Sequence, residues 1–164
     1  MWYKRRVPKP LWAPWRLEYI AKADEDGECI FCAPDEQLLV HRGRRAFVLL
    51  NKFPYSSGHL MVAPFRHGVE LGELDDEEAL EIHRLAAEAL EALRATYRPD
   101  GSNLGWNLGR VAGAGIVDHV HLHVVPRWSG DTNFMPVLAD VKVMPEHLVE
   151  TRRKLSEAWP SRAV

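Results

Sequence analysis

His119-Val120-His121-Leu122-His123-Val124-Val125-Pro126-Arg127 is the stretch from which the fold of this chain can be worked out. Alternating histidine and aliphatic residues predict a β-strand over His119–Val125, because successive side chains of a strand point to opposite faces. The three imidazoles then share one face, with neighbouring Cα atoms about 6–7 Å apart. The other face is apolar and can pack into a core. An imidazole titrates near neutral pH, so the row can hold and exchange protons.

The composition is that of one globular domain long enough to bury a core. The 164 residues are 46% hydrophobic and 27% charged, with a formal net charge of −2. This balance predicts no nucleic-acid partner and no membrane partner, and no apolar run is long enough for a membrane span. The basic N-terminus is followed by proline and tryptophan rather than by an apolar secretory segment. Because two cysteines are too few for a disulfide framework, a cytoplasmic location is predicted.

Turn residues divide the chain into an arm and a single domain. Residues 1–28 contain several prolines among tryptophans, and we expect an arm that packs on the domain or on a second subunit. Residues 29–164 form the domain. Besides the histidine strand, strands are predicted at Ala46–Leu50, His59–Ala63 and Asn103–Leu108.

Two helices are predicted beside these strands. The longer one begins at Asp75, where Glu78 has capping-box spacing, and it stops before Pro99. The last helix is predicted from about Pro145 to Trp159. Strands with mostly short connections therefore predict an α+β fold: an antiparallel β-sheet with one long helix and a C-terminal helix.

A glycine-rich loop precedes the histidine strand. Small residues such as Gly113, Ala114 and Gly115 expose backbone N–H groups, which form an anion-binding concavity in a turn. The amide of Asn107 can bond a phosphate oxygen. A histidine row beside such a loop indicates phosphoryl or nucleotidyl transfer, and a plain hairpin loop is the alternative.

Several stretches resemble the histidine triad (HIT) superfamily. His119-x-His121-x-His123 follows Asn107-x-Gly109-x-x-Ala112-Gly113 and precedes Pro126-Arg127. The segment Asn51–Pro64 is similar to the family's nucleotide-side strand pair. The likeness runs in order from about residue 12 to the C-terminus. It implies a homodimeric nucleotide hydrolase or transferase whose middle histidine attacks the α-phosphate of a bound nucleotide.

Carried over by position, the resemblance implies a role for each histidine of the site. His121 would be the nucleophile that forms a nucleotidyl-histidine intermediate, with its second ring nitrogen held by the His119 backbone carbonyl. His123 would donate to a phosphate oxygen. His59 would be a partner of the triad.

The resemblance also implies nucleotide contacts. Asn51 matches a position that binds a ribose hydroxyl, and Asn107 with the loop of Gly113, Ala114 and Gly115 would hold phosphate. Of the tryptophans, Trp128 lies just beyond the histidine strand and is the one to which we assign a substrate contact.

The loop departs from the pattern of the hydrolase branches. Those branches carry Gln-Ser/Thr directly after the Ala-Gly pair, whereas this chain has Ala114-Gly115-Ile116 and one extra residue before His119. With Leu11–Arg16 and Trp128, it is most similar to the diadenosine tetraphosphate phosphorylase branch. There, inorganic phosphate rather than water releases the adenylate to give ADP. A dinucleoside polyphosphate hydrolase and a nucleoside phosphoramidase are the alternatives within the superfamily.

The cysteines form a Cys29-x-x-Cys32 pair, which can supply half of a tetrahedral zinc site. Resemblance to zinc-bearing HIT proteins implies that His67 and His119 complete a structural site, with no organic cofactor. A buried pair without metal and a redox pair are the alternatives.

Two other classes of protein also suit three histidines on one strand face. A catalytic or transported metal bound there predicts activity that is lost on chelation and no covalent nucleotide. A nucleotide-binding module predicts binding without turnover. The triad interpretation instead predicts metal-independent chemistry and an acid-labile adenylyl-histidine.

Overall fold

The structure is a computed structural model that describes residues 29–68, 70–112, 114, 116, 118–131 and 146–161. The predicted arm at residues 1–28 lies outside the described residues, as do Gly113 and Gly115. Within these described ranges, no helix has the length and apolar character needed to cross a membrane.

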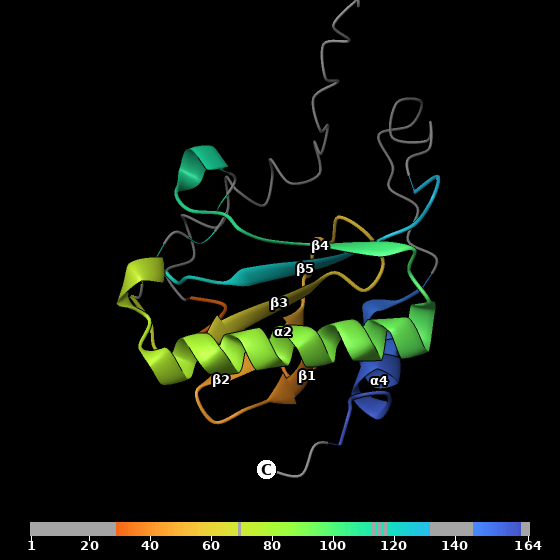
Figure 1. Cartoon of the computed structure of the whole chain (residues 1–164), viewed down its shortest axis with the longest axis horizontal. Helices are drawn as coiled ribbons and strands as arrows, with labels where there is room; N and C mark the ends of the chain where they lie inside the picture. Colours follow the sequence, from red (N-terminus) through yellow and green to blue (C-terminus); the bar gives the residue numbers. More distant parts are fainter. Residues whose placement is uncertain are drawn as a thin grey trace, which may run out of the picture.

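The described residues form a five-stranded sheet in the order β1-β2-β3-β5-β4, and its neighbouring strands are antiparallel (Figure 1). The strands are β1 (Leu39–Arg42), β2 (Ala46–Leu50), β3 (Leu60–Pro64), β4 (Gly101–Trp106) and β5 (Leu122–Arg127). The helices are α2 (Asp76–Tyr97) and α4 (Leu148–Glu157), with single 3-10 turns η1 (Leu71–Glu73) and η2 (Arg110–Ala112). The α+β fold predicted from the sequence is confirmed.

Helix α2 crosses one face of the sheet (Figure 1) and begins where the sequence predicts. The carboxylate of Asp75 accepts from the Glu78 N–H at 2.8 Å, and the Glu78 side chain accepts from the Asp75 N–H at 3.1 Å. This capping box satisfies donors that the first turn leaves open. Arg98 ends the helix in the left-handed region, with Pro99 next.

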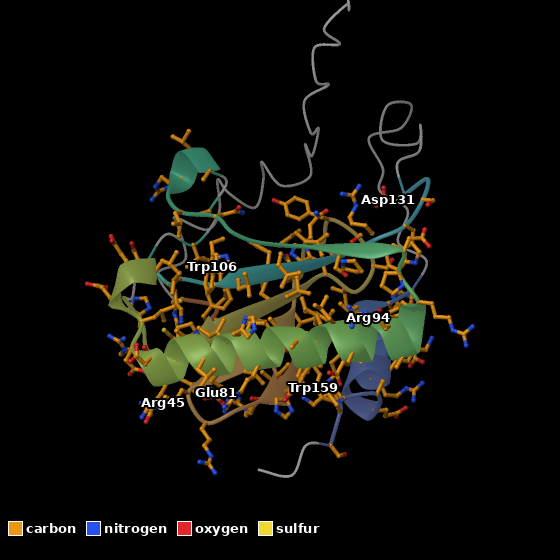
Figure 2. The ribbon with its side chains drawn as sticks, in the orientation of Figure 1. Arg45, Glu81, Arg94, Trp106, Asp131 and Trp159 are labelled. Atoms are coloured by element: carbon orange, nitrogen blue, oxygen red, sulfur yellow. The ribbon has the colours of Figure 1, made fainter. Side chains whose placement is uncertain are left out.

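A side chain of α2 also holds the turn between β1 and β2. The carboxylate of Glu81 accepts from the backbone N–H groups of Arg44 and Arg45, at 2.6 and 2.8 Å (Figure 2). A Cβ at Gly43 would lie 2.1 Å from this carboxylate, so the turn leaves no room for a side chain there. Helix and sheet are thus joined by hydrogen bonds as well as by apolar packing.

The two faces of the sheet bury different clusters. One cluster packs β-sheet residues such as Val48, Val62 and Val124 against apolar residues of α2 and α4. The opposite face carries Phe47, Leu49, Met61 and Ala63, together with Phe31 from the segment before β1. His123 pairs with Met61 across β3 and β5, which assigns the histidines to this second face. The site is therefore built on the face that α2 leaves uncovered.

The histidine strand is shorter at its start than the sequence predicts. Strand β5 begins at Leu122, so His119 and His121 precede it. The ladder with β3 ends at the Val62–Leu122 pair. Pro64 has no N–H to continue it, and its carbonyl accepts from the His119 side chain instead.

The other predicted elements are present with shifted ends. Strand β3 lies one residue later than predicted, and β4 ends at Trp106, two residues before the predicted end. Helix α4 starts at Leu148, after His147 at its N-cap, rather than at Pro145. Strand β1 was not predicted, because four residues with a bulge after Leu39 show no clear alternation.

Helix α4 closes the β1 edge of the sheet. The Arg152 Nε donates to the Leu39 carbonyl at 2.7 Å, and the Ser156 hydroxyl donates to the Val40 carbonyl at 3.0 Å. These donors come from residues four apart, on one face of the helix. At the other edge, no strand within the described ranges pairs with the outer side of β4.

Candidate active site

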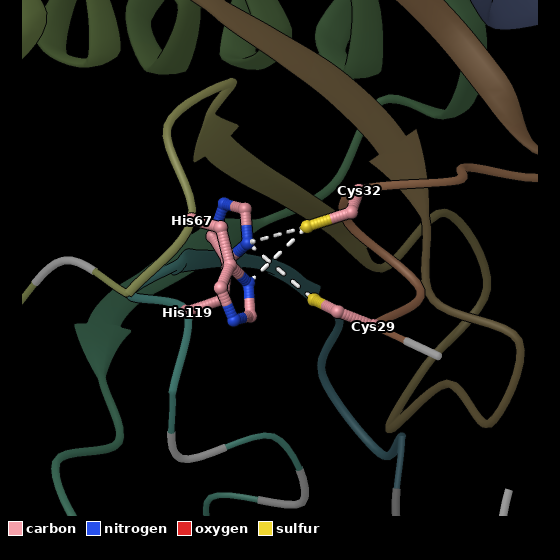
Figure 3. A group of neighbouring side chains, drawn as sticks. All are labelled: Cys29, Cys32, His67 and His119. Carbon is pink, nitrogen blue, oxygen red and sulfur yellow. Dashed lines mark hydrogen bonds between the residues drawn. The ribbon is translucent and has the colours of Figure 1, made fainter. Parts of the chain in front are cut away.

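Four side chains from three segments converge beside the histidine row. Cys29 and Cys32 come from the turn before β1, His67 from the loop after β3, and His119 from the segment before β5 (Figure 3). Their ligand atoms lie within 4.8 Å of one another. The structure therefore brings together the four residues predicted as zinc ligands.

The spacing of these atoms fits a tetrahedral zinc ion. With Zn–S near 2.3 Å and Zn–N near 2.0–2.1 Å, a tetrahedron has S···N edges of roughly 3.6 Å. The Cys29 Sγ is 3.4 Å from His119 Nδ1, and Cys32 Sγ is 3.2 Å from His67 Nδ1 and 3.8 Å from His119 Nδ1. Two thiols and two imidazoles are also the donor set of many structural zinc sites.

His119 is held in the tautomer that a metal ligand needs. Its Nε2–H donates to the Pro64 carbonyl at 2.8 Å, which leaves the lone pair on Nδ1 facing the cysteines. Burial lowers the pKa of His119, more than the hydrogen bond to Pro64 raises it, so the ring is neutral at pH 7.

His121 is held by the main chain of His119. The His121 Nδ1–H donates to the His119 carbonyl at 2.8 Å, as the sequence argument expected. A carbonyl can only accept, so the proton is on Nδ1 and the lone pair is on Nε2. This tautomer gives a neutral imidazole one nucleophilic nitrogen.

The tautomers of His59 and His123 follow from a backbone amide. The Tyr55 N–H donates to His59 Nδ1 at 3.1 Å, so His59 carries its proton on Nε2. His59 Nε2 lies 3.0 Å from His123 Nδ1, which therefore accepts. A neutral His123 must then carry its own proton on Nε2, the nitrogen that faces Asn107 at 3.2 Å.

The proton on His123 also decides how Asn107 is oriented. The Asn107 Nδ2 is the atom placed at this contact, but an amide nitrogen and an N–H are both donors. The amide is therefore assigned in the flipped orientation, in which its oxygen accepts from His123. The ring of His123 lies edge-on to that of His121, with centroids 4.9 Å apart. The two imidazoles are therefore neighbours on this face of the sheet, and the N–H of His123 is on the nitrogen that faces Asn107.

Phe31 is a site residue that sequence reasoning missed. It lies between the two cysteines, and its ring centroid is 4.6 Å from that of His121 and 5.1 Å from that of His119. The only signal in the sequence was an aromatic residue inside the Cys29-x-x-Cys32 pair. No periodicity could show that this turn folds onto the histidine face.

Two other predicted contact residues, Asn51 and Ala114, make hydrogen bonds within the protein. Asn51 is buried, its oxygen accepts from the Phe53 N–H at 2.9 Å, and its nitrogen donates to the weak acceptor Met61 Sδ at 3.5 Å. Ala114 already donates to the Gly109 carbonyl at 3.3 Å, so its N–H is not free for phosphate in this turn.

Trp128 is not brought together with the triad in this chain. It lies five residues beyond His123, or about 17 Å along an extended strand. Its indole N–H donates to the Tyr97 carbonyl at the end of α2. A substrate contact by this tryptophan therefore stays a prediction.

The fold and the histidine row define a nucleotide-processing enzyme of the histidine triad class. The HIT domain model matches residues 35–130, and the chain belongs to this family. It is 39% identical over 162 residues to the AP-4-A phosphorylase of Mycobacterium tuberculosis, and the alignment covers 91% of this chain and 83% of that protein. Membership and this relative identify the chain as a HIT-family nucleotidyl transferase or hydrolase.

Two solved structures have a similar fold. A Zn-bound histidine triad family protein from Mycobacterium smegmatis has a TM-score of 0.60 and 26% identity, covering 86% of this chain and 91% of that one. A hypothetical histidine triad nucleotide-binding protein from Sulfolobus tokodaii has a TM-score of 0.64 and 25% identity, covering 79% and 91%.

Proposed function

We propose that this enzyme splits diadenosine tetraphosphate by phosphorolysis, giving ATP and ADP through an adenylyl-His121 intermediate. The observation that carries the proposal is the hydrogen bond from His121 Nδ1 to the His119 carbonyl, which leaves Nε2 as a nucleophile. Similarity to an AP-4-A phosphorylase supports this choice of substrate over other dinucleoside polyphosphates.

In the first half of the reaction, the Nε2 lone pair of His121 attacks the α-phosphorus. A P–N bond forms as the bond from this phosphorus to the bridging oxygen breaks, and ATP leaves with that oxygen. The Nε2–H of His123 donates to a phosphate oxygen and stabilises the charge that develops there. Asn51 binds a ribose hydroxyl, and Asn107 turns to the phosphate when substrate displaces its contact with His123.

In the second half, an oxygen of inorganic phosphate attacks the adenylyl phosphorus. The P–N bond breaks, ADP leaves, and His121 returns to its neutral state. The family glutamine that follows the Ala-Gly pair in hydrolase branches has no counterpart at Ala114-Gly115-Ile116. Alanine and glycine are smaller than glutamine, and this difference in size favours phosphate as the acceptor in place of water.

We propose that Cys29, Cys32, His67 and His119 hold one zinc ion. Four protein ligands close a tetrahedral site, so the ion would supply structural cross-linking and no open position for chemistry. The Zn-bound relative from Mycobacterium smegmatis supports the identity of the metal.

We further propose that the enzyme works as a homodimer in the cytoplasm. The outer edge of β4 lacks a partner strand among the described residues, and Leu104 on this strand is 46% exposed. An open edge of this kind can pair with a second copy. Cys29 and Cys32 are not joined by a disulfide, and a reducing compartment would keep both thiols as zinc ligands.

The decisive experiment compares diadenosine tetraphosphate turnover with and without inorganic phosphate. Phosphorolysis predicts ATP and ADP that appear only when phosphate is present. AMP released without phosphate would identify a hydrolase instead. Turnover that survives zinc removal and a trapped, acid-labile adenylyl-enzyme would exclude a metal-dependent hydrolase.

A variant pair tests the nucleophile. His121→Asn should lower turnover by several orders of magnitude while nucleotide binding stays near normal. His83→Asn is the matched control, because His83 is exposed on α2 and far from the triad face. Retained turnover in His121→Asn would reject the adenylyl-histidine mechanism.

A further inference from the structure

Phe31 is the residue through which the cysteine turn touches the proposed nucleophile. Its side chain is 2% exposed, and it packs on Phe47 at a centroid distance of 6.5 Å as well as on the two histidines. The turn that carries it is closed by hydrogen bonds from the Cys32 and Ala33 N–H groups to the Cys29 carbonyl, at 2.9 and 3.2 Å. The ring is therefore fixed both by its backbone and by its packing.

The imidazole of His121 needs more than one restraint to aim Nε2 at a phosphorus atom. The hydrogen bond to the His119 carbonyl holds Nδ1 but lets the ring pivot about that nitrogen. His123 approaches edge-on, with an interplanar angle of 75°, and limits motion within the site. Phe31 packs against the imidazole at a centroid distance of 4.6 Å, with an interplanar angle of 34°, and so limits tilting of the ring plane.

Burial separates this role from a binding role. With 2% of the side chain exposed, Phe31 has no open ring face on which a nucleotide base could stack. Its contacts are with protein groups, and His121 is the nearest of the aromatic partners described for it.

We propose that Phe31 is a positioning residue, which sets the orientation of the His121 ring for attack. This inference rests on the proposed function of His121 as the nucleophile. A planar ring against the imidazole restrains its tilt, whereas a flexible aliphatic side chain of similar volume fills the space without doing so. Geometry errors near 1 Å can cost about a hundred-fold in rate.

The test replaces Phe31 by leucine and, separately, by methionine, which has nearly the volume of leucine but an unbranched chain that adapts to irregular space. We expect the rate of adenylyl-enzyme formation in a single turnover, and kcat with it, to fall by about ten- to a hundred-fold. KM should stay within about two-fold, and zinc content should match that of the wild-type protein. Phe65→Leu is the matched control with activity unchanged, because Phe65 is 39% exposed and its described ring contact is with Phe47.

Several results would overturn the inference. A raised KM with unchanged kcat would make Phe31 a binding residue, and loss of zinc in step with activity would make its role purely structural. If both variants fail to fold, proton NMR of the wild-type enzyme decides. Nuclear Overhauser contacts between the Phe31 and His121 rings support the proposal, and their absence rejects it. Loss of turnover in His121→Asn with normal kcat in Phe31→Leu would refute this inference alone, whereas an active His121→Asn would refute the proposed function.

Discussion

His59 links the Tyr55 backbone N–H to His123 by hydrogen bonds and so fixes which nitrogen of His123 carries the proton. Replacing His59 tests this hydrogen-bond relay. The side chain is fully buried, accepts from the Tyr55 N–H and donates to His123 Nδ1. His59→Leu fills the buried position with an apolar side chain that makes neither hydrogen bond. His59→Gln offers an amide oxygen for Tyr55 and an amide N–H for His123, so it reproduces both.

The magnitude follows from the contacts that the leucine leaves open. A buried polar group without a partner costs about 1–3 kcal/mol. If His123 loses that much of its preference for the Nε2–H form in the transition state, kcat/KM falls by about 5- to 150-fold, since 1.36 kcal/mol is tenfold. His59→Gln should recover most of this loss.

The assay is steady-state turnover of diadenosine tetraphosphate with saturating phosphate, run on wild-type protein and both variants. Thermal unfolding of each variant shows whether an activity loss is simply a loss of folded enzyme. Equal activity in His59→Leu and His59→Gln, at similar stability, would refute the reasoning. The relay would then have no part in catalysis.

The remaining predictions concern the metal and two titrating groups. Protein never exposed to chelator should contain about one zinc per chain, and Cys32→Ser should lower this content in a metal analysis; far less zinc in the wild-type protein would contradict the site. The hydrogen bond from Arg66 holds the pKa of the Glu78 carboxyl below the ordinary value of 4.5. The pair therefore contributes to the free energy of unfolding above pH 4.5, and this contribution is lost as pH falls through the lowered pKa. Glu78→Gln should lower the urea midpoint at neutral pH and much less in acid. Burial and the hydrogen bond to Glu146 raise the pKa of Tyr97 to about 12, from 10.0. Stability should fall as pH rises between these values, and Tyr97→Phe should remove that fall in alkaline unfolding curves, a result that phenolate absorbance can check.

Much of the fold was within reach of sequence reasoning where local signals were strong. Asp75 and Glu78 placed the start of α2 correctly, because a capping box is a local interaction. The extent of the histidine strand was not within reach. It depends on where β3 stops, and a proline in that other strand, Pro64, ends the ladder.

The sequence predicts which histidines belong to the site but not the hydrogen bonds that hold them. The spacing of His121 and His123, with a family resemblance, was enough to assign them to one face. The tautomers of His59, His119 and His121 are fixed by main-chain atoms: the Tyr55 N–H, the Pro64 carbonyl and the His119 carbonyl, respectively. Every residue carries such atoms, so no residue type marks them in a sequence.

The hydrogen bonds from Arg152 and Ser156 to β1 limit how far these sheets can grow in an assembly. A sheet with two open edges can add copies without end, which is how fibres form. Here the Leu39 and Val40 carbonyls on the β1 edge already accept hydrogen bonds from α4, which covers that edge. In the proposed dimer, two copies that meet through β4 would use up the remaining edge of each, so association by strand addition would stop at a pair.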